Sequence, residues 1–114
     1  MPLTEDHNVM SAYRAGALRD VAFEELDGHW HSLTRTVGTS AHVTPDLRFV
    51  MPDAGDVVLL CSDGLTDMLA DDHIAAVLAA EAEPEAACRR LVAEANEAGG
   101  RDNITAVVAR FDGA

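Results

Sequence analysis

Two aspartates stand where a metal site could form. Asp63 comes directly after the apolar run 57–61, and Asp102 directly before the run 104–111, which is rich in Val, Ile and Thr. A glycine follows the first aspartate and two precede the second, so the backbone can approach closely at both places. If the two runs are neighbouring strands, the carboxylates meet at one end of a sheet. Carboxylate oxygens are ligands that Mg²⁺ and Mn²⁺ prefer, so a divalent cation would fit there.

The same residues allow several other interpretations. An Asp-Gly pair after a strand is most often only a turn. A cysteine nucleophile at Cys61 would need a phosphate-cradling loop closed by an arginine, and residues 62–68 contain none. An aspartyl-phosphate enzyme would carry aspartate at position 61, and an EF-hand loop would need alternating oxygen ligands that residues 63–72 lack. From the residues alone, a turn and an oxygen-ligand metal site both stay open.

Strands are predicted on both sides of a turn at residues 52–55. Leu, Phe and Met recur at every second position over 46–51, the period of a half-buried strand. The continuous apolar run 57–61 favours a strand buried on both faces, and the two runs together favour an antiparallel hairpin. Shorter strands are expected at 3–7 and 32–37.

Helices are predicted before and after these strands. Two short ones are expected over 9–14 and 18–25. A third begins near Asp71 or Asp72, whose side chains are suited to cap it. A fourth starts at Pro84, carries one apolar stripe and ends at a pair of glycines.

The predicted fold class is α+β. A mostly antiparallel sheet, completed by a last strand over 104–111, would be covered on one face by two helices. The segment 62–68 is expected to be a loop between the sheet and the first of these helices. No segment of the sequence is expected to cover the other face of the sheet.

Composition excludes several classes of partner. The 114 residues suit one small domain, and a net charge of -12 argues against nucleic acid and anionic membranes. No run is long enough for a membrane span, and the first residues lack the pattern of a signal peptide. Cys61 and Cys88 lie in apolar stretches and are expected to be buried thiols in a reducing compartment. A cytoplasmic protein is expected.

Whole strings of the sequence resemble one known family. Residues 55–67 read Gly-Asp-Val-Val-Leu-Leu-Cys-Ser-Asp-Gly-Leu-Thr-Asp, and residues 99–108 read Gly-Gly-Arg-Asp-Asn-Ile-Thr-Ala-Val-Val. These resemble the last two metal-binding motifs of the PPM (metal-dependent, type 2C-like) protein serine/threonine phosphatases, in a bacterial style. Residues 3–7 and 33–38 resemble two further segments in the family's order. The intervening residues 8–31 resemble the family's flap beside the active site.

The resemblance implies a fold and a reaction. The fold would be the C-terminal half of a four-layer αββα sandwich, and the reaction would be hydrolysis of phosphoserine and phosphothreonine by metal-activated water. Asp63 and Asp102 would each ligate Mn²⁺ or Mg²⁺. Asn103 would orient Asp102 or a water on the metal. The partner would be a phosphoprotein substrate.

The resemblance also implies what this sequence does not contain. The family's N-terminal half carries a phosphate-binding arginine, a bridging aspartate and a histidine thought to act as general acid, and His7 belongs to a different motif. Residues 1–114 are therefore expected to be a partial phosphatase domain, with 8–31 as the flap and 43–111 as the sheet, helices and metal motifs. Alone, the chain would be inactive or very weak, and its partner could be the missing half or a second copy. The alternatives are an inactive interaction module or a truncated remnant.

Overall fold

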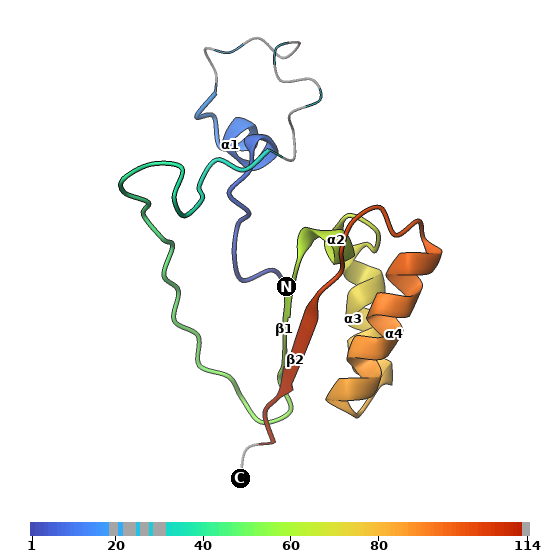
Figure 1. Cartoon of the computed structure of the whole chain (residues 1–114). Coiled ribbons are helices and arrows are strands. Elements are labelled where there is room, and N and C mark those ends of the chain that lie inside the picture. The colour runs from blue at the N-terminus through green and yellow to red at the C-terminus, as the bar shows by residue number, and fades with distance from the viewer. Residues whose placement is uncertain (19–20, 22–24, 26–27, 29–31, 113–114) are drawn as a thin grey trace. The chain divides into compact units, whose positions relative to one another are not determined.

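The computed structural model describes residues 1–18, 21, 25, 28 and 32–112. The chain divides into two compact units, Met1–Phe49 and Val50–Ala114, and each is described by itself. Figure 1 shows the elements in the order α1 (Val9–Arg14), β1 (Val57–Cys61), α2 (Asp63–Thr66), α3 (Asp71–Ala80), α4 (Pro84–Glu97) and β2 (Ala106–Arg110).

Among its described residues, the first unit contains one short helix with the predicted bounds. α1 begins after Asn8, whose side-chain oxygen accepts a hydrogen bond from the Ser11 amide at 2.8 Å and so caps the helix. An isolated antiparallel bridge joins Asn8 to Leu33. The expected helix over 18–25 lies largely outside the described residues.

The strands expected at 3–7 and 32–37 are wrong. The two segments meet only around the Asn8–Leu33 bridge, where Thr34 donates to the His7 carbonyl at 2.9 Å. α1 starts immediately after this point and turns the chain away, so no ladder can continue along it.

The second unit is a two-stranded antiparallel sheet with α3 and α4 packed on one face (Figure 1). The register runs from Val57 opposite Arg110 to Cys61 opposite Ala106. The predicted α+β class, with two helices covering an antiparallel sheet, is therefore confirmed. The expected strand over 104–111 is present as the shorter β2.

An apolar cluster between the helices and the sheet holds the second unit together. Its buried members come from α2, α3, α4 and the turn after α2, namely Leu65, Leu69, Ile74, Val77, Leu91 and Ala95. Leu59 of β1 and Ala106 of β2 pack against them from the sheet. Burial of a side chain such as Leu91, which is fully inaccessible to solvent, contributes roughly 1.5–3 kcal/mol relative to exposure.

The sequence signals predicted the ends of α4 correctly and the N-cap of α3 incorrectly. α4 has Pro84 in its first turn, and the chain leaves it through Gly99 and Gly100, both with positive φ. α3 starts at Asp71, near the expected position. Its N-cap is Ala70, which offers no side-chain acceptor, so the expected cap by an aspartate is wrong.

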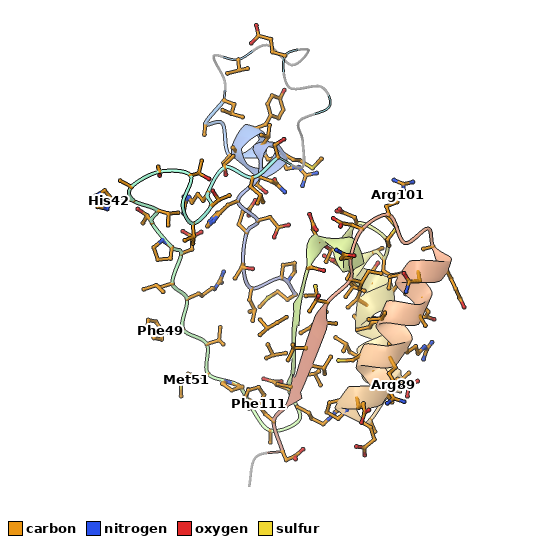
Figure 2. The ribbon with its side chains drawn as sticks, in the orientation of Figure 1. His42, Phe49, Met51, Arg89, Arg101 and Phe111 are labelled. Carbon is orange, nitrogen blue, oxygen red and sulfur yellow. The ribbon has the colours of Figure 1, made fainter. Side chains whose placement is uncertain are left out.

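The hairpin predicted from the run 46–51 is also wrong. None of these residues lies in a strand, and β1 pairs with β2 instead. Phe49 is 96% and Met51 93% exposed, and both are drawn with their side chains in Figure 2. Alternation of apolar residues indicates a strand only where one face finds a partner, and no such packing is present here.

Burial of β1 on both faces is wrong as well. The helices cover one face only, and Leu60 remains 66% and its cross-strand neighbour Val107 55% exposed on the other. Cys61 is exposed rather than buried, because it lies where the sheet ends. Cys88 is half-buried, and its thiol lies 3.7 Å from the Ala106 carbonyl oxygen.

Candidate metal centre

The register of the sheet brings the two aspartate-bearing segments together. Cys61 pairs with Ala106 at the end of the ladder, and the Ser62 amide then donates to the Thr105 carbonyl at 2.9 Å. Asp63 is the next residue on one side, and Asp102 lies three positions before Thr105 on the other. Both segments therefore meet at the same end of the sheet, as the sequence predicted.

The Ser62 side chain joins the same two segments a second time. Its hydroxyl donates to the Asn103 carbonyl at 3.2 Å and accepts from the Thr105 amide at 3.0 Å. This serine was not among the site residues predicted from the sequence. The only local signal was a hydroxyl residue directly before the first residue of a helix, a position where such residues favour capping. Ser62 makes no side-chain cap to α2 and bonds across the sheet instead.

Gly64 allows the closest approach between the segments. A Cβ atom built on this glycine would lie 2.1 Å from the Asn103 carbonyl oxygen, far inside van der Waals contact. No side chain can therefore be accommodated here without moving the backbone of one segment. The sequence-based expectation that this glycine permits close approach is confirmed.

Asp63 is the first residue of a short helix that sequence analysis took for a loop. α2 forms because Asp67 donates its amide to the Asp63 carbonyl at 2.8 Å while the side chain of Leu65 is buried in the core. The helix orients Asp63 at the corner between β1 and the core. Its side chain is exposed to solvent.

Asp102 lies in the turn between α4 and β2, next to Arg101, which Figure 2 labels. One carboxylate oxygen of Asp102 accepts from the Asn103 amide at 2.7 Å, and the side chain is otherwise exposed. The backbone of Asn103 thus orients this carboxylate. A role for the Asn103 side chain stays a prediction.

The two carboxylates of Asp63 and Asp102 could supply some of the oxygen ligands that a hard divalent cation needs. Within the described part of the chain, no three His, Cys, Asp or Glu side chains converge on one point. The available donors at this end of the sheet are thus two exposed carboxylates and nearby backbone carbonyls. Mg²⁺ keeps several waters and is usually held by one or two carboxylates, so this pair suits it or Mn²⁺.

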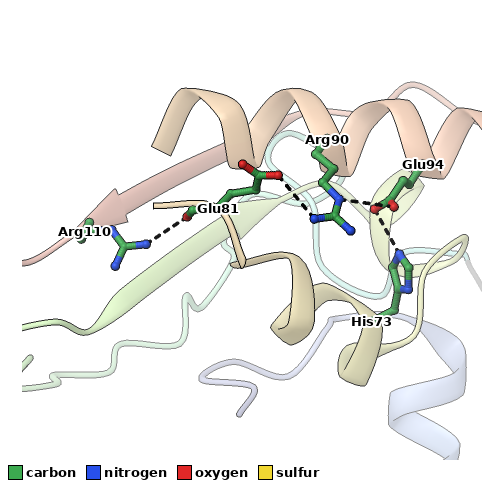
Figure 3. Close-up of polar contacts among 5 residues, drawn as sticks. All are labelled: His73, Glu81, Arg90, Glu94 and Arg110. Atoms are coloured by element: carbon green, nitrogen blue, oxygen red, sulfur yellow. Dashed lines mark hydrogen bonds and ion pairs between the residues drawn. The ribbon is translucent and has the colours of Figure 1, made fainter. Parts of the chain in front are cut away.

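A separate polar network links the helices to the sheet (Figure 3). Arg90 lies between Glu81 and Glu94, with N···O distances of 3.4 Å to each, and His73 lies 3.1 Å from the other oxygen of Glu94. Arg110 donates to the Glu81 carbonyl at 3.1 Å. The hydrogen bond with His73, assisted by the charge of Arg90, lowers the pKa of Glu94. The network stabilises the packing of α3, α4 and β2 and does not include the two candidate ligands.

The first unit has a polar cluster of its own. The Asp46 carboxylate contacts His7 Nε2 at 2.7 Å and Arg35 at 3.0 Å, and these hydrogen bonds lower the pKa of Asp46. A cavity of about 450 Å³ lies among residues 33–44 of this unit, lined mainly by hydroxyl side chains. The described residues contain no helix with the length and apolar character required to cross a bilayer.

Comparison with known proteins shows similarity to bacterial phosphatases over most of the chain. A family model described as Stage II sporulation protein E (SpoIIE) matches residues 7–112. Protein phosphatase PhpP of Streptococcus pneumoniae is 35% identical over 106 residues, which are 90% of this chain and 42% of PhpP.

Solved structures of bacterial phosphatases superpose well on the chain. The S. agalactiae serine/threonine phosphatase has a TM-score of 0.76 and 36% identity, over 95% of this chain and 45% of its own. The Mycobacterium tuberculosis serine/threonine phosphatase PstP/Ppp has a TM-score of 0.73 and 34% identity, over 98% of this chain and 47% of its own. The chain therefore spans less than half the length of these relatives. It belongs to the SpoIIE family, and its resemblance to the bacterial, metal-dependent protein serine/threonine phosphatases is confirmed.

Proposed function

We propose that this chain supplies two metal ligands, Asp63 and Asp102, to the catalytic centre of a protein serine/threonine phosphatase. The observation that carries the proposal is the double connection between their segments, through the bonds of Ser62 and the contact of Gly64 with Asn103. It places both carboxylate-bearing segments at one end of the sheet. The relatives of the chain are phosphatases.

In this proposal, Mn²⁺ or Mg²⁺ would supply Lewis acidity toward a phosphoryl oxygen and lower the pKa of a water. Asp63 and Asp102 would hold the ion, and the amide of Asn103 orients Asp102 by the bond already described. The exposed position of both carboxylates leaves them accessible to a phosphoprotein. Residues that bind the phosphate and protonate the leaving group would come from outside these two segments.

The proposal extends to the domain and its setting. Residues 1–114 would form part of a PPM-type phosphatase domain, with 8–31 as the flap and 43–111 carrying the sheet, helices and metal motifs. The chain would act in a bacterial cytoplasm on phosphoserine and phosphothreonine in proteins. Two features support this setting: the relatives are bacterial, and neither cysteine forms a disulfide.

The test is hydrolysis of a phosphothreonine peptide in Mn²⁺ by the chain and by a chimera in which the chain replaces the matching segment of PhpP. We expect little turnover by the chain alone, and turnover by the chimera that falls more than about 100-fold in Asp63→Asn and Asp102→Asn, since loss of even a supporting group costs 10–100-fold. Asp112→Asn, a change of equal charge at an exposed position, is the matched control. Undiminished turnover in both ligand variants of a folded chimera would reject the proposal.

One observation favours a second candidate, an inactive phosphatase-like interaction module. The uncovered sheet face exposes Leu60 and Val107 side by side, and an apolar face of this kind favours association. Self-association in sedimentation, lost in a Leu60→Glu/Val107→Glu variant, would support this candidate. A monomer at all concentrations would count against docking on a second copy.

A further inference from the structure

Ser62 makes three hydrogen bonds to the segment that carries Asp102. Its amide bonds to the Thr105 carbonyl at 2.9 Å, and its hydroxyl bonds to the Asn103 carbonyl at 3.2 Å and the Thr105 amide at 3.0 Å. The first bond continues the ladder and survives any substitution other than proline. The two others depend on the hydroxyl.

The hydroxyl is well suited to this position. A serine hydroxyl donates one proton and accepts at its lone pairs, and here it donates to a carbonyl and accepts from an amide. Alanine would leave the Thr105 amide and the Asn103 carbonyl without this partner. Threonine keeps both hydrogen-bonding functions, so it provides a conservative replacement.

The bonds flank the two candidate ligands. Ser62 precedes Asp63 by one residue, and Asn103 follows Asp102 by one residue. On the other side of Asp63, Gly64 approaches the same Asn103 carbonyl oxygen. The backbone of Asp63 is thus fixed against a single carbonyl group from both of its neighbours.

A metal site depends on such fixation because its ligands must be held within about 0.5 Å of their productive positions. We propose that Ser62 is a positioning residue, whose hydroxyl sets the separation of Asp63 and Asp102 for binding a divalent cation. This inference rests on the proposed function, since it takes those two aspartates as the ligands.

The test measures Mn²⁺ affinity of the 114-residue chain by the electron paramagnetic resonance signal of free Mn²⁺. We expect Ser62→Ala to bind about 10-fold more weakly, by analogy with other supporting groups of metal ligands, and Ser62→Thr to bind nearly as tightly as the native chain. Thr66→Ala is the matched control. It removes a hydroxyl that bonds within α2, to the Asp63 carbonyl at 3.4 Å, and does not reach the other segment.

A second pair of readouts separates positioning from loss of stability. Val77→Ala in the core should lower the melting temperature without changing Mn²⁺ affinity, whereas Ser62→Ala should change the affinity. In the metal-free chain, amide hydrogen exchange at Thr105 should accelerate in Ser62→Ala and not in Thr66→Ala.

The outcomes distinguish this inference from the proposed function. If Asp63→Asn and Asp102→Asn abolish Mn²⁺ binding while Ser62→Ala binds like the native chain, the positioning role is overturned and the metal site stands. Equal weakening by Ser62→Ala and Ser62→Thr also overturns it, because the hydroxyl is then not the cause. If the native chain binds no Mn²⁺, this inference fails and the chimera alone decides the proposed function. If the aspartate variants bind Mn²⁺ as tightly as the native chain does, both proposals fail.

Discussion

The two units of the chain differ in the interactions that stabilise each of them internally. No described residue of Met1–Phe49 is buried, and its polar contacts include the cluster at Asp46 and a bond from Arg48 to the Leu3 carbonyl. Val50–Ala114 has a cluster of buried apolar side chains on one face of a sheet. Exposed ion pairs typically contribute less than about 1 kcal/mol each, whereas a buried leucine contributes more. The candidate ligands lie in the unit with the core, where the backbone is best fixed.

The largest effect expected to expose this difference comes from one leucine-to-alanine change in each unit. Leu91→Ala removes a fully buried side chain and should lower the free energy of unfolding by about 2–5 kcal/mol. Leu47→Ala, at a position that is 82% exposed, should change it by less than about 0.5 kcal/mol. Urea denaturation followed by circular dichroism measures both. Equal losses in the two variants would contradict the contrast between the units.

A smaller loss of stability is expected from a change at Gly64, where α2 lies against the Asn103 carbonyl. Gly64→Ala forces a Cβ against the Asn103 carbonyl, and we expect destabilisation of about 1–3 kcal/mol, as for other overpacked sites. An ordinary helical glycine gains stability, by about 0.5–1 kcal/mol, from the same change. Ala75→Gly, on the exposed face of α3, gives the reference value for an unconstrained site. A stabilised Gly64→Ala chain would show that the close approach is absent.

Loss of the Asp46 carboxylate should loosen the first unit and leave the second unit unchanged. Asp46→Asn removes the charge that His7 and Arg35 share, so tryptic cleavage after Arg14, Arg35 and Arg48 should accelerate. Cleavage within the second unit should keep its rate. Asp6→Asn is the matched control, because Asp6 is also an exposed acid and lies outside this cluster. The same acceleration in both variants would assign the effect to net charge.

The smallest effect is expected from acid. The pKa of Glu94 is lowered from its ordinary value of 4.5, first by the His73 hydrogen bond, so the folded state binds fewer protons than the unfolded state. This contribution is complete above pH 4.5 and is lost as the pH falls through the lowered value. Glu94→Gln should flatten the decline of the urea midpoint below that pH, and Glu97→Gln should not. If the urea midpoint declines with pH equally in both variants, Glu94 does not contribute to the acid sensitivity.

Local signals made part of the fold predictable. The start of α4 follows from Pro84, which acts within one turn of the helix, and α1 has the bounds 9–14 that were expected of it. The hairpin failed because alternation over 46–51 describes a strand in isolation and cannot say which segment it meets. β1 instead found a partner far along the chain, at Ala106–Arg110.

Some residues of the candidate site were likewise predictable from local sequence and others were not. Asp63, Gly64 and Asp102 could be singled out because their neighbours place turns next to strands. Ser62 could not, because its hydroxyl bonds span 41 and 43 positions and depend on the register of the sheet. The two-faced burial of β1 failed for a related reason: composition indicates that a strand is apolar, and only the packing determines how many faces are covered.

The pairing of β1 with β2 also sets an order of events during synthesis. β1 leaves the ribosome before α3 and α4, and it has no ladder until Ala106–Arg110 have been added. The helix pair can form early from local contacts, whereas closure of the sheet joins segments distant in the chain and is the slower event. Asp63 and Asp102 therefore come together last, and any capacity to hold a cation is acquired only when translation of this region is complete.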